Sequence, residues 1–101
     1  MELLKHLEGI DYKDTNARDF ENLIYGILSK EGRVWSQVIV NDRGDGRRGK
    51  VDFIWQKEKE IIGIEIDYKS PRKKSIFKLK QLNANKGYIL LRSPFKIIEI
   101  Y

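Results

Sequence analysis

Acidic and apolar residues alternate along the segment 64–69, and this pattern suggests chemistry more strongly than any other in the chain. Because side chains of a β-strand point alternately to its two faces, Glu65, Asp67 and Lys69 lie together on one face of the expected strand. Carboxylates at positions i and i+2 are roughly 6–7 Å apart by strand geometry. Keeping both ionised away from water is unfavourable unless a cation lies between them. The segment therefore predicts a site for a divalent metal or a lysine.

Asp52 is expected to reach the same site from the preceding strand. If the two strands form an antiparallel hairpin around residues 57–60, position 52 lies opposite residues in the upper sixties. Oxygen ligands with open coordination positions suit Mg²⁺ or Mn²⁺. We therefore predict a metal held by Asp52 and Asp67. Glu65 is left open as a further ligand, a group that modifies the pKa of its neighbours, or a surface residue.

Composition restricts the other kinds of site. The chain has no Cys and a single His, His6, so disulfides, thiol catalysis, cysteine-bound zinc and a histidine metal cluster are excluded. Its net charge of +5, from 20 basic and 15 acidic residues, favours a polyanionic partner such as nucleic acid. No apolar run is long enough to span a bilayer, and no signal-peptide pattern begins the chain. We expect a soluble, intracellular (cytoplasmic) protein without an organic cofactor.

The 101 residues, of which 41% are hydrophobic, are enough for a single domain over 1–101. A short helical turn is expected around Leu3–Leu7, before the main elements. The main elements are expected as a helix over 20–28, strands over 34–40, 51–56 and 61–68, a helix from Ser70 to 82, and strands over 88–91 and 96–100. This order, α-β-β-β-α-β-β, favours an α/β sandwich built around a mixed sheet.

The ends of the two helices carry capping signals. Asp14, Thr15 or Asn16 can cap the first helix, and Gly32 fits the position that follows its last turn. Ser70 followed by Pro71 predicts the start of the second helix, because proline is favoured at the first helical position. The N-terminus of that helix could receive a phosphate.

Basic residues flank the expected site on both sides. The first group lies on the glycine-rich loop 41–50 and the second at the start of the later helix, and together they are Arg47, Arg48, Lys50, Arg72, Lys73 and Lys74. These residues predict contacts with nucleic-acid phosphates. The alternatives are a flexible connecting loop and the solvated side of an amphipathic helix. Trp35, Phe53 and Trp55 are expected in the core rather than as platforms for base stacking.

Asp52 followed by Asp67-Tyr68-Lys69 resembles the PD-(D/E)XK nuclease superfamily, which includes restriction endonucleases and archaeal Holliday junction resolvases. The likeness extends from about residue 19 to residue 93 and implies a restriction-endonuclease-like mixed sheet flanked by helices. It also implies that Asp52 and Asp67 hold metal and that Lys69 positions or activates the attacking water. Glu21, on the first helix, resembles a further acidic residue that the family frequently has. Val51 stands in place of the proline that names the motif.

The resemblance implies a Mg²⁺- or Mn²⁺-dependent endonuclease that hydrolyses DNA phosphodiester bonds and is possibly specific for Holliday junctions or of the restriction type. Bound divalent ions supply an activated water and neutralise charge on the phosphorus. A domain of this size has little surface with which to enclose a duplex, and two cuts call for two sites, so a homodimer is expected. Two alternatives stay open: a non-catalytic nucleic-acid-binding protein on the same fold, and a structural or protein-binding domain.

Overall fold

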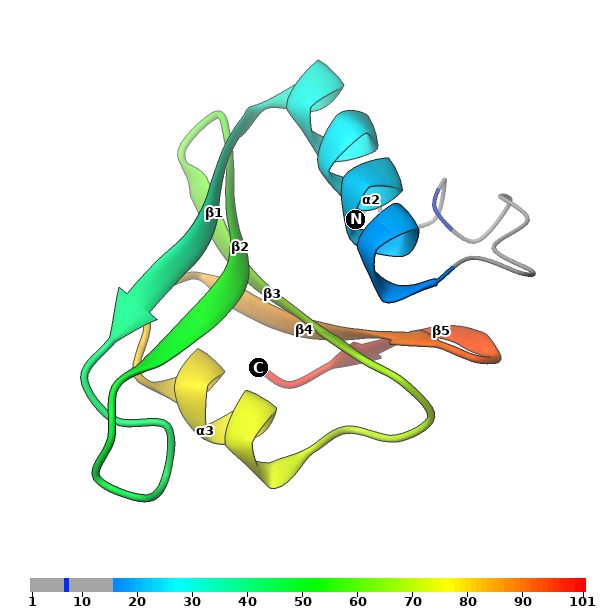
Figure 1. The fold of residues 1–101 in the computed structure, drawn as a ribbon. Helices are drawn as coiled ribbons and strands as arrows, with labels where there is room; N and C mark the ends of the chain where they lie inside the picture. Colours follow the sequence, from blue (N-terminus) through cyan, green and yellow to red (C-terminus); the bar gives the residue numbers. More distant parts are fainter. Residues whose placement is uncertain (1–6, 8–15) are drawn as a thin grey trace.

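The computed structural model describes Leu7 and residues 16–101, which form an α/β structure with a five-stranded mixed sheet (Figure 1). The helices are α2 (Ala17–Glu31) and α3 (Lys73–Lys80), and the strands are β1 (Arg33–Val40), β2 (Gly49–Lys57), β3 (Glu60–Asp67), β4 (Lys86–Arg92) and β5 (Phe95–Glu99). The predicted class and element order are thus confirmed for this part of the chain. The expected turn of helix at Leu3–Leu7 and the caps at Asp14 and Thr15 lie outside it, except for Leu7.

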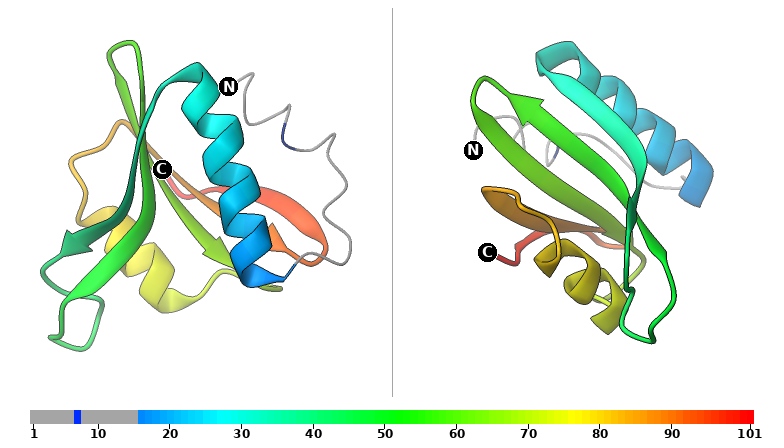
Figure 2. Two further views of the ribbon diagram at one scale, coloured as in Figure 1. Left: turned by 45° about the horizontal axis from the view of Figure 1, so that its top comes forward. Right: turned by 90° about the vertical axis from the view of Figure 1, so that its left-hand side faces the viewer.

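The strands lie side by side in the order β1-β2-β3-β4-β5. All neighbours are antiparallel except β3 and β4, which are parallel and are connected through α3. Figure 2 shows α2 on one side of the sheet and α3 on the other. Because α3 follows directly after β3, its first turn lies next to the end of the strand that carries Glu65 and Asp67. Neither described helix is long and apolar enough to cross a membrane.

Each helix covers its own hydrophobic cluster. Under α2, the buried side chains of Phe20, Ile24 and Leu28 pack against Phe53 and Trp55 of β2 and against residues of β3 and β4. Under α3, the buried members are Val40, Val51, Leu79, Ile89 and Leu91. The sheet is therefore covered on both faces, and Phe53 and Trp55 are core residues as predicted. Trp35 is not, because 45% of its surface is exposed on the edge strand β1.

At Asp52 the inward-facing side chains of the hairpin β1-β2 change from one side of the sheet to the other. In a regular strand Val51, Phe53 and Trp55 would share one face. Val51 instead belongs to the cluster under α3, whereas Phe53 and Trp55 belong to the cluster under α2. The register of β1 with β2 is interrupted at the same level, between Ser36↔Phe53 and Val38↔Val51. Asp52 therefore lies at a twist between the two sides of the sheet.

Both helix ends differ in part from the expected capping. Asn16 caps α2 as predicted, with Oδ1 accepting from the Asp19 amide at 2.8 Å. Gly32 ends α2 in an extended conformation rather than a left-handed one. Its lack of a side chain matters for a different reason, because a Cβ there would collide with the carbonyl oxygen of Gln56 and approach Trp55 Nε1.

The later helix starts two residues beyond the predicted cap. Arg72 is the N-cap of α3, without a side-chain capping bond, so the expectation that Ser70 caps the helix and Pro71 opens it is wrong. The reason is that Asp67, at the end of β3, takes over the capping role from a distance: its Oδ2 accepts from the Arg72 amide at 2.8 Å. A tertiary contact has replaced the local signal.

Candidate active site

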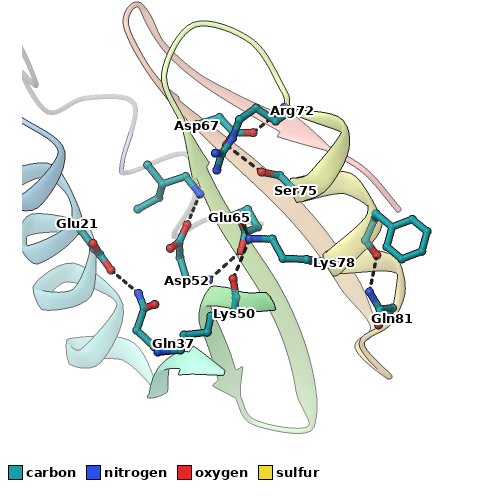
Figure 3. Close-up of polar contacts among 12 residues, drawn as sticks. Glu21, Gln37, Lys50, Asp52, Glu65, Asp67, Arg72, Ser75, Lys78 and Gln81 are labelled. Carbon is teal, nitrogen blue, oxygen red and sulfur yellow. Dashed lines mark hydrogen bonds and ion pairs between the residues drawn. The ribbon is translucent and has the colours of Figure 1, made fainter. Parts of the chain in front are cut away.

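An acidic row, made of Asp52 on β2 and Glu65 on β3, crosses these two adjacent strands at the twist. The register of β2 with β3 runs as far as Phe53↔Ile64, so the next opposed residues are Asp52 and Glu65. Their side chains replace backbone carbonyls as acceptors: Glu65 Oε1 accepts from the Asp52 amide at 3.0 Å, and Asp52 Oδ2 accepts from the Ile66 amide at 2.8 Å (Figure 3). Two carboxylates thus stand where the strands separate. The predicted approach of Asp52 to β3 occurs, with Glu65 as its direct opposite.

Glu65 is buried and incompletely satisfied. Its side chain is inaccessible to solvent, and among the described residues its Oε2 is a buried oxygen that has no hydrogen-bond partner. Lys78 Nζ on α3 lies 3.2 Å from Oε2, which makes an ion pair without hydrogen-bond geometry. Burial and the nearby charge of Asp52 raise the pKa of Glu65 to about 7, against the opposing effect of Lys78. The protonation state of Glu65 therefore changes close to neutral pH.

Asp52 has a related but milder electrostatic environment. Partial burial raises its pKa, the hydrogen bond from Ile66 lowers it, and the charge of Glu21 raises it further. Asp52 lines two cavities, one of about 650 Å³ and one of about 360 Å³. It is therefore the carboxylate of the row that a ligand can reach.

Asp67 lies beyond the row, and its oxygens are already engaged. Oδ1 accepts from Arg72 Nε at 2.7 Å and from Ser75 Oγ at 2.8 Å, and Oδ2 accepts from the Arg72 amide. The negative charge at the start of α3 also complements the helix dipole. The position that we expected a phosphate to occupy thus holds a carboxylate of the chain itself. Asp67 lines the smaller cavity together with Asp52, so the two residues face one space, but its main contacts are structural.

Glu21 reaches the same cavity from α2, as the sequence suggested. Its Oε1 accepts from Gln37 Nε2 at 3.0 Å, and Figure 3 shows this pair beside Asp52. Gln37 has a φ of 55°, a left-handed conformation that costs free energy for a residue other than glycine. Gln37, a strained residue at the twist, therefore orients the carboxylate of Glu21.

Lys69 is not brought to the carboxylates. It is exposed, and its Nζ lies 5.3 Å from the centre of the Tyr68 ring. It lines neither cavity that contains Asp52. The lysine in contact with the acidic row is Lys78, which the sequence did not single out. The available signal was its position on α3: Ser75, Lys78 and Leu79 are spaced i, i+3, i+4 and share one face of the helix.

The larger cavity is lined by basic side chains around Asp52. They come from the loop after β1, from β2 and from α3, and they are Arg43, Arg48, Lys50, Arg72, Lys74 and Lys78. Among the described residues, Arg48, Lys50 and Lys74 form no ion pair. Four of the six predicted nucleic-acid residues therefore gather at this cavity, whereas Arg47 and Lys73 do not line it.

The glycine-rich loop connects β1 to β2 and forms hydrogen bonds within itself. Asp42 Oδ1 accepts from the amides of Gly44 and Gly46, at 2.8 and 2.9 Å. Both glycines have positive φ, a conformation that side chains disfavour. Gln81 of α3 joins the loop to the helix, accepting from the Asp42 amide and donating to its carbonyl. The basic side chains are thus presented on a fixed backbone.

Within Leu7 and residues 16–101, no group of three or more His, Cys, Asp or Glu side chains is assembled as a metal site. The predicted set Asp52, Glu65 and Asp67 is divided, because Asp67 turns to α3. Comparison with family models, with curated proteins and with solved structures gave no match to this chain. Inference about function must therefore start from the geometry of the site.

Proposed function

We propose that the protein is a metal-dependent endonuclease that hydrolyses phosphodiester bonds in DNA, on a restriction-endonuclease-like fold. The observation that carries this proposal is the pair Asp52 and Glu65 at the point where β2 and β3 separate. Both carboxylates have a raised pKa, and Glu65 keeps a buried oxygen without a hydrogen bond. Structural carboxylates are ordinarily satisfied by donors. Glu65 Oε2, which has only the ion pair with Lys78, and Asp52, which lines the open cavities, together favour a cationic ligand.

The donor set fits Mg²⁺ or Mn²⁺. Two carboxylates are the usual protein contribution to a Mg²⁺ site, in which water and substrate phosphate complete the coordination. Asp52 and Glu65 would hold the ion, while Asp67, whose oxygens accept from Arg72 and Ser75, would support α3 instead. When bound, such an ion lowers the pKa of a water and neutralises charge on a phosphate.

The chain's own residues would divide the remaining tasks. Lys78, held against Glu65, supplies a fixed positive charge at the mouth of the basic cavity and is better placed than Lys69 to face a phosphate. Glu21 lines the smaller cavity with Asp52 and can accept a proton from, or orient, a water there. Gln37 holds Glu21 in that orientation.

The basic cavity supports DNA as the partner. Arg48, Lys50 and Lys74 surround the approach to Asp52 without ion-pair partners among the described residues, so their charges are available to backbone phosphates. A homodimer, with one site for each strand, would suit double-strand cleavage and the four-way junction that we propose to test first.

One observation favours the non-catalytic alternative. Lys78 already neutralises Glu65, and Arg72 already neutralises Asp67. A protein that needs no metal could use these same pairs simply to hold α3 on the sheet. Such a protein would bind DNA through the basic cavity and cut nothing.

Cleavage assays distinguish the two functions. Wild type, Asp52→Asn and Glu65→Gln are incubated with duplex, single-stranded and four-way-junction DNA, in Mg²⁺, Mn²⁺ or EDTA. Cutting by wild type that chelation and both substitutions abolish would support the nuclease. Salt-dependent binding without cutting in any metal would favour the binding protein, and cutting that survives in both variants would refute the assigned site.

A further inference from the structure

The two cavities that meet at Asp52 differ in their walls. The larger is surrounded by lysine and arginine side chains, as a charged backbone would require. The smaller, of about 360 Å³, is lined by one aromatic residue and two arginines, Tyr68, Arg72 and Arg92, together with acidic residues. Asp52 therefore lies between the larger cavity, which suits phosphates, and the smaller cavity, whose lining includes residues with planar side chains.

The aromatic wall is built by backbone contacts. The carbonyl oxygen of Tyr68 accepts from the amides of both Arg92 and Ser93, each at 3.0 Å. This anchor joins the end of β3 to the end of β4, and it sets Arg92 Cζ 4.7 Å from the centre of the Tyr68 ring. Despite these contacts, 52% of Tyr68 remains exposed. The backbone at Tyr68 is thus held in place, while part of the residue remains accessible to a ligand.

Flat groups of this kind select flat ligands. Nucleobases stack on tyrosine rings and on guanidinium planes, whatever the base, because every base has a π-face. A cavity of about 360 Å³ lies at the small end of ligand sites, which span roughly 300–1,000 Å³. That size suits one nucleoside and not a stretch of duplex. Lys69, the other cation near the ring, does not line this cavity.

We infer that the cavity formed by Tyr68, Arg92 and Arg72 binds one unstacked nucleobase of the DNA, next to the basic cavity that would receive the backbone phosphate. This inference rests on the proposed function and specifies its substrate: DNA with an unpaired nucleotide at the cleavage position, as in a single strand, an overhang or a branch. Fully paired duplex would have to extrude a base first, at a cost of a few kcal/mol.

The test measures binding in EDTA, so that it does not depend on cleavage. A duplex with one unpaired nucleotide and its fully paired counterpart are compared by fluorescence anisotropy with wild type, Tyr68→Ala, Tyr68→Trp and Tyr25→Ala. Tyr25 is the matched control because its exposure is similar, at 44%, and it lines neither cavity. Stacking contributes about 1–3 kcal/mol per base, so we expect wild type to bind the unpaired site roughly 5- to 100-fold more tightly.

Tyr68→Ala should remove that preference, whereas Tyr68→Trp and Tyr25→Ala should retain it. Iodouracil placed at the unpaired position should photocrosslink to the peptide that carries Tyr68. Equal affinity for the two DNAs, or an unchanged preference in Tyr68→Ala, would overturn the inference. If wild type still cut DNA in Mg²⁺, the proposed function would survive that result; absence of both binding and cutting would end both.

Discussion

Asp67 and the pair Asp52–Glu65 lie within two neighbouring strands, yet they differ in how their oxygens are satisfied. Asp67 accepts three hydrogen bonds from Arg72 and Ser75 and is almost completely buried. Glu65 is equally buried but has an oxygen with no hydrogen bond, and its pKa rises to about 7. The three acids therefore differ in the number of donors around each carboxylate. Under the proposed function, that number separates the structural acid from the two functional ones.

The largest effect is expected on activity. Asp52→Asn and Glu65→Gln should each lower DNA cleavage by about 100-fold or more, because losing several kcal/mol of transition-state stabilisation costs a factor of ten per 1.4 kcal/mol. Neither should unfold the protein, since both carboxylates are destabilised by burial. Rates and urea denaturation of the same preparations check this. A large loss of stability with normal activity would show that Asp52 and Glu65 act in the structure and not in catalysis.

Asp67→Ala should have the opposite signature. Removing a buried acceptor leaves Ser75, the Arg72 amide and the Arg72 side chain without their partner, so we expect a loss of about 3–5 kcal/mol in the free energy of unfolding. Asp67→Asn keeps an acceptor and should lose less. Urea denaturation measures both variants. A stable Asp67→Ala protein that no longer cuts DNA would show that Asp67 acts in catalysis after all.

The two lysines provide the next test. Lys78→Met should lower activity by about 10-fold or more, because Lys78 is held against Glu65. Lys69→Met, the change that the sequence motif favours, should lower it less, since Lys69 contacts the Tyr68 ring instead. The pH–rate profile adds a readout beyond packing: without Lys78 the pKa of Glu65 rises, and the profile should move to higher pH. An unmoved profile with Lys69→Met inactive would restore the motif assignment.

The smallest expected effect is a pH dependence of stability. The pKa of Glu65 is raised from 4.5 to about 7 in the folded protein, so the folded state holds an extra proton between these values. Stability from this group is complete below pH 4.5 and is lost as the pH rises through 7. The loss is on the order of 1–3 kcal/mol.

Glu65→Gln should flatten this dependence and melt at a higher temperature than wild type at pH 8. Adding Mg²⁺ at that pH should raise the melting temperature of wild type and leave Glu65→Gln unchanged, because a ligand that binds only the folded state stabilises it. Thermal melts across pH, with and without Mg²⁺, supply the measurement. Parallel curves for the two proteins would remove Glu65 from the proposed site.

Local patterns predicted the order of helices and strands, the cap at Asn16 and the approach of Asp52 to β3. They could not predict the face exchange at Asp52, because it depends on a paired irregularity with Gln37 on another strand. Lys78 rather than Lys69 contacts Glu65 because of where the connection from β3 to β4 places α3, which is a tertiary property. The start of α3 likewise follows from Asp67, a residue outside the helix.

DNA affinity was expected from the charge, and four of the six basic residues named from sequence gather at one cavity. Arg43, which was not among the six, also lines this cavity and forms an ion pair with Asp45. The nuclease assignment, the metal and DNA as a partner are predictions that the assays above test.

The hydrogen bonds between Gln81 and Asp42 link the glycine-rich loop to α3. Gln81 binds both the amide and the carbonyl of Asp42, and it is the residue directly after α3, three positions after Lys78. A displacement of the loop would therefore also displace the helix. Under the proposed function, DNA bound to the arginines of the loop would shift the helix that carries Lys78. Binding of the DNA backbone and the position of the positive charge beside Glu65 would then change together.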